Sequence, residues 1–301
     1  MKHNLITILG PTAVGKTSLG ALLAYNFNGE IISADSRQVY RGMDIGTGKD
    51  LKDYEVDGKI IPYHLIDVYN PQHEYNLFYF YKMFFDAFKE IEAKDKTPFL
   101  VGGTGLFIHS VLKNYSLNEV KFSQQRYEEL NKLEYDELAK QLIEIQPKQH
   151  NTTDLVTKER VIKALMIAEE KELHSIEYKK KINSLVIGVG LPREIVRNRI
   201  TERLKERLKN GMIEEVKRLI LEGITYARLE QLGLEYKYAA KFLKNELSYQ
   251  QMFERLNTAI HQFAKRQMTW FRKMEREGIE INWIDGANYE QAEKLITEKY
   301  F

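Results

Sequence analysis

The feature that most constrains this chain is a glycine-rich loop near its start, in the segment ILGPTAVGKTSLG. A short apolar run ends at Leu9, and the spacing Gly10-x-x-x-x-Gly15-Lys16-Thr17 follows it directly. This order of strand, loop and helix is that of a P-loop, in which backbone N–H groups surround a phosphate. Lys16 adds a mobile positive charge, and Thr17 offers a hydroxyl to Mg²⁺. The predicted phosphate site is Gly10, Pro11, Thr12, Ala13, Val14, Gly15, Lys16 and Thr17.

The surrounding pattern predicts an α/β domain with a parallel sheet flanked by helices. Apolar runs at residues 30–34, 98–101 and 184–191 have the length of buried strands. Asp35 follows the first of these runs and Thr104 the second, and ligands of such sheets bind at the carboxyl edge. Asp35 taken alone could instead cap a turn. A nucleotide hydrolase often has an Asp where Thr104 and its neighbouring glycines stand, which argues against an ordinary ATPase.

A helical insertion is expected between residues 116 and 183, where strands disappear and Tyr, Glu, Lys and Gln increase. The catalytic core would then be residues 1–115 and 184–301. Asp154 can cap a helix that runs to about Lys171. Arg160 and Lys163 share a face of this helix, and they could contact phosphates or form an ordinary solvated surface. Arg126 is equally ambiguous.

Two long helices are expected after the insertion, at residues 193–221 and 249–276. The first carries Arg199, Arg203 and Arg207 at four-residue spacing, which could neutralise a leaving diphosphate. The second carries KRQMTWFRK, from Lys265 to Lys273. Basic residues interleaved with aromatic ones are typical of a nucleic-acid surface, where cations meet phosphates and rings stack on bases.

Composition excludes several classes of protein. The chain has no Cys, which rules out disulfides and thiolate zinc sites. No apolar run approaches the roughly 20 residues of a membrane-spanning helix. Because only four residues precede the first strand, we expect no signal peptide. The net charge of +2 neither demands nor forbids a nucleic-acid partner. We expect a cytoplasmic protein that does not bind membranes and acts as a monomer.

Taken together, these segments resemble tRNA dimethylallyltransferase, the bacterial tRNA isopentenyltransferase family. The matching blocks span most of the chain in the family's order: GPTAVGKT (10–17), SADSRQVYRGMDIGTGK (33–49), IPYHLID (61–67), VGGTGLF (101–107), KERVIKAL (158–165), RNRITERL (197–204), GMIEEV (211–216) and AKRQMTWFR (264–272). Their joint occurrence is far more specific than any single block.

The resemblance implies transfer of the dimethylallyl group from dimethylallyl diphosphate to N6 of adenosine 37, next to the anticodon, in tRNAs that read codons beginning with U. Diphosphate would be released, with Mg²⁺ as cofactor, and the P-loop fold could also bind a nucleotide such as ATP. The implied catalytic residues are Asp35, Thr104 and Arg203. The implied contacts with the tRNA anticodon stem-loop are Asp35, Ser36, Arg37, Gln38, Thr104, Arg126, Glu159, Arg160, Val161, Ile162, Lys163, Lys265, Arg266 and Gln267.

The sequence departs from the family pattern at three places. Lys163 stands where the family commonly has an Arg, residues 233–236 read GLEY for GYKE, and Ile260-His261 replaces a Thr-Arg pair. These departures put individual RNA contacts in doubt and leave the reacting centre unchanged. The alternatives are a small-molecule kinase that uses ATP, a dimethylallyltransferase acting on free AMP, and an RNA-binding module without activity. The insertion and the basic, aromatic helix favour RNA, because a mononucleotide would need neither.

Overall fold

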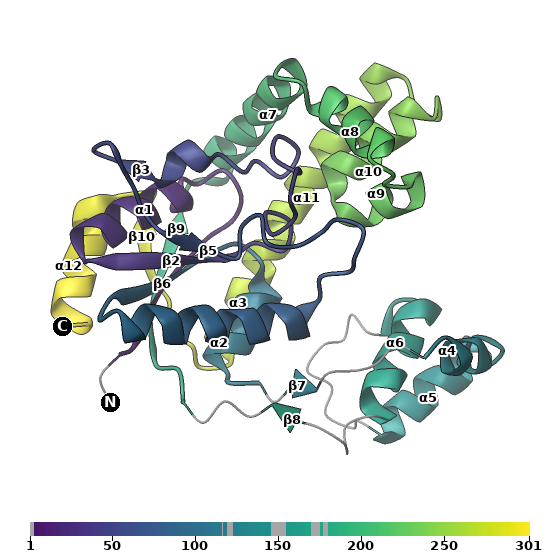
Figure 1. Ribbon diagram of the computed structural model, residues 1–301, viewed down its shortest axis with the longest axis horizontal. Coiled ribbons are helices and arrows are strands. Elements are labelled where there is room, and N and C mark those ends of the chain that lie inside the picture. Colours follow the sequence, from purple (N-terminus) through teal and green to yellow (C-terminus); the bar gives the residue numbers. More distant parts are fainter. Residues whose placement is uncertain (1–2, 116, 119–122, 146–154, 170–174, 177–179) are drawn as a thin grey trace. The chain divides into compact units, whose positions relative to one another are not determined.

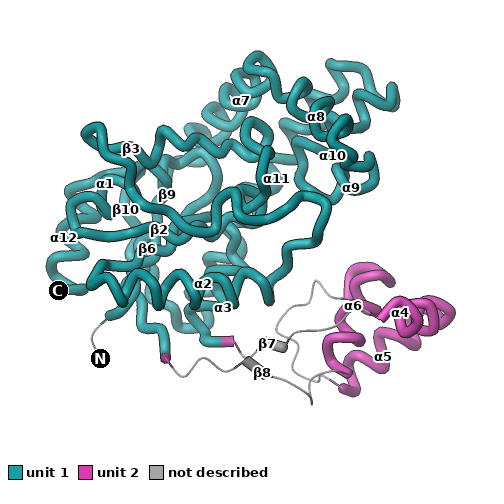
Figure 2. Tube along the Cα trace, viewed as in Figure 1, with its two compact units in different colours: residues 1–114, 181–301 teal, residues 115–180 magenta. Residues whose placement is uncertain are grey.

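The structure is a computed structural model that describes residues 3–115, 117–118, 123–145, 155–169, 175–176 and 180–301. The chain divides into two compact units (Figure 2). Unit 1 comprises residues 1–114 and 181–301, and unit 2 comprises residues 115–180, nearly the stretch expected as an insertion. Within the described ranges, no helix is long and apolar enough to cross a bilayer.

Unit 1 is built on a six-stranded parallel sheet in the order β10-β9-β1-β6-β2-β5. Its strands are β1 (Leu5–Leu9), β2 (Gly29–Ala34), β5 (Tyr63–His64), β6 (Thr97–Gly102), β9 (Ser184–Gly190) and β10 (Asn282–Asp285). All residues of β1 and β2 are buried, which explains why these strands read as nearly unbroken apolar runs. The predicted parallel α/β core is confirmed. A separate antiparallel pair consists of β3 (Glu55–Val56) and β4 (Lys59–Ile60).

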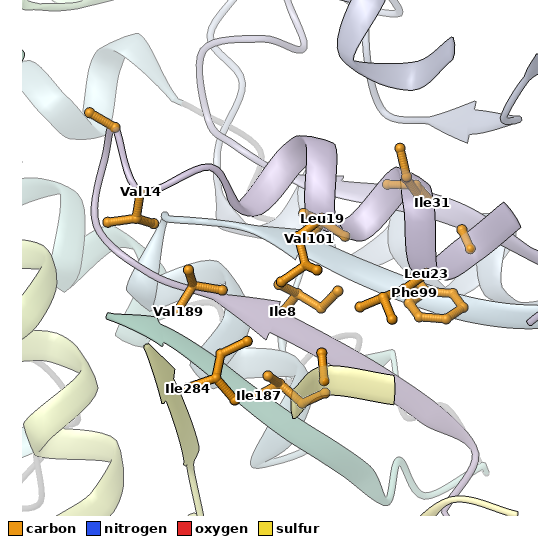
Figure 3. Close-up of a cluster of buried hydrophobic side chains, with 14 of the residues drawn as sticks. Ile8, Val14, Leu19, Leu23, Ile31, Phe99, Val101, Ile187, Val189 and Ile284 are labelled. Carbon is orange, nitrogen blue, oxygen red and sulfur yellow. The ribbon is translucent and has the colours of Figure 1, made fainter. Parts of the chain in front are cut away.

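Helices cover both faces of this sheet, with α1 on one face and α2 and α3 on the other (Figure 1). The helices of unit 1 are α1 (Lys16–Asn26), α2 (Leu77–Ala93), α3 (Gly105–Leu112), α7 (Arg193–Lys209), α8 (Met212–Leu221), α9 (Tyr226–Leu232), α10 (Leu234–Leu243), α11 (Tyr249–Arg276), α12 (Tyr289–Lys299) and the 3₁₀ helix η1 (Leu51–Tyr54). Figure 3 shows side chains of one buried cluster, in which four adjacent strands contribute Ile8, Val101, Val189 and Ile284 beside Leu19 of α1. This core fixes α1, and therefore the loop before it, against the sheet.

The single helix predicted over residues 193–221 is two helices in the structure. Gly211, between α7 and α8, has a φ of 97°, a left-handed conformation that ends one helix and starts the next. Apolar residues keep their helical spacing across this break, so their periodicity alone extends the helix too far. Strand β10 is also missing from the prediction, because its four residues at the sheet edge contain only two apolar side chains, Trp283 and Ile284, which is too short a run to indicate a strand.

Unit 2 has its own small hydrophobic core. Its described helices are α4 (Gln124–Asn131), α5 (Tyr135–Ile145) and α6 (Lys158–Glu169). The structure adds a short antiparallel pair, β7 (Leu117–Asn118) with β8 (Ser175–Ile176), so the expectation of an entirely helical insertion needs this correction. Two-residue strands carry no periodicity that a sequence could reveal. The predicted cap Asp154 and the helix end at Lys171 lie outside the described residues.

Candidate active site

Three neighbouring strands end side by side and carry the predicted site residues. Gly102 of β6 pairs with both Leu9 of β1 and Ala34 of β2. The loops that follow these strands therefore leave the sheet at one edge, as predicted. Two hydrogen bonds join them: the Thr104 N–H donates to the Ala34 carbonyl (3.1 Å), and Thr104 Oγ1 accepts the N–H of Ser36 (3.1 Å).

The P-loop has the backbone that a phosphate site requires. Ala13 and Gly15 adopt left-handed φ angles of 66° and 89°. Gly15 is the N-cap of α1 and supplies no side chain to the first turn, so the N–H groups there are open to an anion. At Gly10, a Cβ would lie 2.6 Å from the carbonyl oxygen of Val189, so glycine allows the loop to begin this close to β9. The geometry agrees with the phosphate site that the spacing predicts.

Lys16 is partly buried at the start of α1, where its Nζ donates a hydrogen bond to the carbonyl of Pro11 (3.2 Å). Burial lowers the pKa of Lys16 to about 8; Asp35 opposes this shift and Arg203 adds to it. These three charges therefore influence one another electrostatically. A bound phosphate would supply the stabilisation that burial removes and keep the ammonium protonated.

The arginine row of α7 lies beside the P-loop. Arg199 Nη1 donates to the carbonyl of Ala13 in the loop (3.5 Å), and Arg207 forms an ion pair with Glu235 (3.2 Å). Arg203 lies between them in the sequence and is partly buried; burial lowers its pKa, and the charge of Arg207 adds to this effect. Lys16, Arg199 and Arg203 make this edge of the sheet electropositive, which suits a diphosphate, whereas the charge of Arg207 is offset by Glu235.

Asp35 is partly buried immediately after β2. Its Oδ1 accepts the backbone N–H groups of Arg37 (2.8 Å) and Gln38 (3.3 Å). This is the turn-capping role considered as an alternative for Asp35, and it occupies one oxygen. Oδ2 accepts no hydrogen bond from the part of the chain that the structure describes. One carboxylate oxygen is therefore fixed by the backbone, and the other is open to a ligand.

The turn after Asp35 is supported by two further segments. Gln38 Nε2 donates to the carbonyl of Gly48 (3.4 Å). Arg37 lies against Gly233, where a Cβ would be 3.9 Å from its Cδ, and burial lowers the pKa of the guanidinium. Residues predicted to touch a nucleic acid are thus held in place by the protein on one side.

Gln267, which the sequence predicts as an RNA contact, is inside unit 1 and is 6% exposed. Its Oε1 accepts the N–H of Thr12 in the P-loop (2.9 Å), and its Nε2 donates to the carbonyl of Gly103 (2.9 Å). Both ends of the amide are therefore occupied by protein, and the expectation of direct RNA contact is corrected. Gln267 braces the P-loop against the loop that carries Thr104.

Replacing Gln267 with leucine is expected to weaken binding of inorganic diphosphate about tenfold, because a buried N–H and a buried C=O lose their partners. Isothermal titration calorimetry with the Mg²⁺ salt measures this affinity. Gln262→Leu, at an exposed position of α11, is the matched control. Equal affinities for the two variants would contradict the brace, provided that their melting temperatures show both to be folded.

The outer face of α11 retains the basic and aromatic character that the sequence predicts. Lys265 and Arg266 are exposed. The Arg266 guanidinium lies 6.0 Å from the ring centre of Phe263, and Lys273 Nζ lies 4.8 Å from that of Trp270. Alternating cations and rings of this kind suit single-stranded nucleic acid.

In unit 2, Arg126 forms ion pairs with Glu169 (2.6 Å) and Glu129 (3.0 Å). The hydrogen bonds that Arg126 donates to Glu169 and Glu129 raise the pKa of its guanidinium. A phosphate that contacts Arg126 in this arrangement must compete with two acidic side chains.

The other residues of unit 2 that are predicted to contact RNA lie on α6, some on its buried side and some on its exposed side. Val161 and Ile162 are 0% exposed, so these side chains form the unit's core and their predicted contact with RNA is corrected. Glu159 and Arg160 are exposed, and Lys163 Nζ lies 3.7 Å from Glu159 Oε1. The charged residues of this block therefore remain candidates for contact with phosphates.

A buried carboxylate near the site is absent from the sequence predictions. Glu215 lies among apolar neighbours on α8 and is 7% exposed. A charged residue within an apolar helical stripe is the signal that could have revealed it, because such a group is buried only where it is hydrogen-bonded.

A P-loop at the carboxyl edge of a parallel sheet, with a carboxylate and an arginine row beside it, defines an α/β protein with a P-loop NTPase-like core. The model of a family described as IPP transferase matches residues 38–274. tRNA dimethylallyltransferase 2 of Phocaeicola vulgatus is 50% identical over 300 residues, which cover 98% of this chain and 97% of that protein. The chain therefore belongs to the IPP transferase family, as its motifs indicate.

Other similar proteins agree with this membership. tRNA dimethylallyltransferase 1 of Geotalea daltonii is 50% identical over 295 residues, covering 98% of this chain and 95% of that protein. The crystal structure of the tRNA isopentenylpyrophosphate transferase of Bacillus halodurans has a TM-score of 0.70 at 32% identity, covering 99% of this chain and 95% of that one. A eukaryotic dimethylallyltransferase acting on tRNA has a TM-score of 0.76 at 24% identity, covering 98% and 77%, which is a likeness of fold.

Proposed function

We propose that the protein transfers the dimethylallyl group of dimethylallyl diphosphate to N6 of adenosine 37 in tRNA, in the cytoplasm, and releases diphosphate. Its tRNAs would be those that read codons beginning with U. The observation that carries the proposal is the pairing of a phosphate loop with Asp35, whose Oδ2 is open. The end of β6 carries Thr104 and glycines in place of an acid, so a carboxylate that would organise a hydrolytic water is lacking among these described residues.

On the donor side, the residues act by holding a diphosphate and absorbing the charge that develops on it. The N–H groups of the P-loop, Lys16 and Arg203 provide fixed positive charge where the C1–O bond of the donor breaks. Thr104 lies at the neighbouring strand end and would position a diphosphate oxygen with its hydroxyl. Because these groups are fixed before the reaction, little reorganisation is needed as the leaving group forms.

On the acceptor side, Asp35 orients the attacking amine. The adenine N6 forms a bond to C1 of the donor as the C1–O bond breaks, and one N6 proton must leave. Asp35 Oδ2 accepts this proton, while Oδ1 stays bound to the two backbone N–H groups that fix the carboxylate. The products are an N6-dimethylallyl adenosine and diphosphate.

The site fits Mg²⁺ as a proposed cofactor. Within the described residues, no cluster of three or more His, Cys, Asp and Glu side chains could cage a metal. Mg²⁺ does not need one, because it commonly binds through substrate phosphates, a few protein oxygens and waters. Thr17, at the first turn of α1, is the residue that would hold it, and the ion would neutralise charge on the diphosphate.

The acceptor is proposed to be an anticodon stem-loop. A base must leave the stack before its N6 can reach Asp35, and this costs least in a single-stranded loop. Ser36, Arg37 and Gln38 follow Asp35 directly and would contact the displaced base and its neighbours. Lys265 and Arg266 would contact phosphates, as would the charged surface of α6 in unit 2.

The mass of an RNA after reaction tests this function. The protein is incubated with Mg²⁺, dimethylallyl diphosphate and an anticodon stem-loop that has adenosine at position 37. The proposal predicts a gain of one five-carbon unit on that base and none on a stem-loop with guanosine there. A parallel reaction contains AMP in place of the stem-loop. If AMP gains the five-carbon unit and the stem-loop does not, the acceptor is a mononucleotide and the proposal is refuted.

Replacing both Lys265 and Arg266 with alanine is expected to weaken stem-loop binding and to lower the slope of log Kd against log salt by about one to two. Each cation that contacts a phosphate releases counterions, so its loss reduces the salt dependence. Fluorescence anisotropy at several salt concentrations measures the slope. Lys294→Ala, an exposed lysine of α12, should leave it unchanged. An unchanged slope for the double variant would place the RNA on another surface.

A further inference from the structure

The loop of residues 44–49 is held by a carboxylate that the proposed mechanism does not use. Glu215 of α8 accepts the backbone N–H groups of Asp44 (2.9 Å), Ile45 (2.8 Å) and Gly46 (3.0 Å). Successive N–H groups that converge in this way form a nest of the kind that binds anions. An internal carboxylate fills this nest, so the loop is fixed by a buried charge of the protein.

Both peptide groups of Gly46 form hydrogen bonds to side chains. Its N–H donates to Glu215, and its carbonyl accepts Nη1 of Arg207 (3.5 Å). Two consecutive residues of α10 support these partners: Tyr236 donates its hydroxyl to Glu215 Oε1 (2.7 Å), and Glu235 pairs with Arg207 (3.2 Å). A Cβ on Gly46 would lie 2.6 Å from the Tyr236 ring, so the loop approaches α10 as closely as glycine allows.

The far end of the same loop is fixed by Lys49, which is 7% exposed. Its Nζ donates to the carbonyl of Tyr40 (3.0 Å) and to the carboxylates of Asp44 (2.7 Å) and Asp67. The loop is therefore anchored at its start by Glu215 and at its end by Lys49. Between these anchors it has little freedom to move.

The anchored loop supports the turn that carries Asp35. The Gly48 carbonyl accepts the side-chain amide of Gln38 (3.4 Å), and the Gln38 N–H donates to Asp35 Oδ1 (3.3 Å). Among the described residues, no hydrogen bond joins this loop to the P-loop. Arg207 of α7 also donates to the Gly46 carbonyl, but it is paired with Glu235 and is not among the residues proposed to hold the diphosphate. A displacement of residues 44–46 would thus act on the acceptor side of the site.

We infer that Glu215 is a positioning residue for the acceptor, and that it acts through the 44–49 loop on Gln38 and Asp35. The inference rests on the proposed function, because it assigns this loop to the side where RNA binds. Glu215 reaches no substrate itself. Removing its charge leaves three N–H groups competing for a weaker acceptor, so the loop should shift and the KM for the stem-loop should rise about tenfold. The KM for dimethylallyl diphosphate should stay unchanged.

Two variants of the full chain test this inference. Glu215→Gln removes the charge, and Tyr236→Phe removes only the hydroxyl that orients it and should raise the KM for RNA in the same direction by a smaller factor. Glu214→Gln, an exposed neighbour on α8, is the matched control. Both KM values, kcat and the melting temperature are measured for each protein. A variant that is only partly folded loses kcat through its inactive fraction and keeps its KM values, so the two effects separate.

The inference is supported if the KM for RNA rises in both variants while their KM for the donor stays at the wild-type value. Both KM values of the Glu214→Gln control should also stay at the wild-type values. It is overturned if the folded variants keep the wild-type KM for RNA, or if both KM values rise together. Should Glu215→Gln fail to fold, Tyr236→Phe decides by the same criteria. Failure of the wild-type protein to modify RNA would refute the proposed function instead, so the two failures are distinguishable.

Discussion

Replacing Asp35 with asparagine is expected to lower kcat about 100-fold or more while the Kd for the stem-loop stays within a few fold of wild type. Asparagine keeps an Oδ1 that can accept the N–H groups of Arg37 and Gln38, so the turn should survive. It cannot accept a proton at the second position, where the carboxylate has its open Oδ2. Single-turnover rates at saturating RNA measure the chemical step, and fluorescence anisotropy measures RNA binding.

Asp57→Asn is the matched control for this substitution. Asp57 is exposed in the turn between β3 and β4 and has a φ of 50°, a conformation that asparagine adopts readily. The single-turnover rate of Asp57→Asn should equal that of the wild type. A rate for Asp35→Asn within about tenfold of wild type would show that the carboxylate is not the proton acceptor. Loss of RNA binding with a normal rate would assign Asp35 to recognition alone.

Replacing Lys16 with methionine is expected to lower kcat/KM for dimethylallyl diphosphate about 100-fold or more. The ammonium lies within the P-loop, and methionine keeps much of its length while removing the charge that a leaving diphosphate needs. Initial rates at varied donor concentration measure the effect, with Lys52→Met on η1 as the exposed control. An undiminished kcat/KM would mean that the diphosphate is held elsewhere.

The same lysine predicts a pH dependence. Burial lowers the pKa of Lys16 to about 8, so the free enzyme loses this positive charge as the pH rises through that value. Since kcat/KM reports ionisations of the free enzyme, kcat/KM for the donor should fall above about pH 8 in the wild type. In Lys16→Met this decline should vanish. A decline that persists unchanged in the variant would belong to another group.

The parts of the site that follow strands directly could be predicted from the sequence. The P-loop, Asp35 and Thr104 each come immediately after a buried run, and parallel strands place their carboxyl ends at one edge. Their proximity depends on chain direction and strand adjacency, which apolar patterns and short connections indicate well. The turn-capping role of Asp35 became visible only in the structure, where Oδ1 accepts two backbone N–H groups and Oδ2 accepts no hydrogen bond from the described residues.

Residues that join distant segments could not be placed in this way. Gln267 lies in a basic, aromatic run, and the motif indicated RNA. Its position on the buried stripe of α11, which is Met252, Leu256, Ile260, Ala264, Gln267, Phe271 and Met274, points inward, and helical spacing could have shown this. The partners of Gln267, Thr12 and Gly103, are far away in the sequence, and periodicity carries no information about partners.

The network around Gly46 was hidden for the same reason. Its sequence, MDIGTGK, is that of an ordinary tight turn. Its importance follows from Glu215 and Tyr236, which lie on helices that the break at Gly211 helps to orient. Val161 and Ile162 show the opposite error, since a family block implied RNA contact for two side chains that the core of unit 2 requires.

If the P-loop holds the diphosphate of a prenyl donor as a leaving group, diphosphate should be released in step with prenyl transfer. The most direct test is the stoichiometry of products when the protein receives Mg²⁺, dimethylallyl diphosphate, ATP and the anticodon stem-loop together. We expect one diphosphate to be released for each prenyl group on the RNA, with the ATP left intact. ATP consumption with phosphate transferred to an acceptor, and no prenyl group on the RNA, would contradict it.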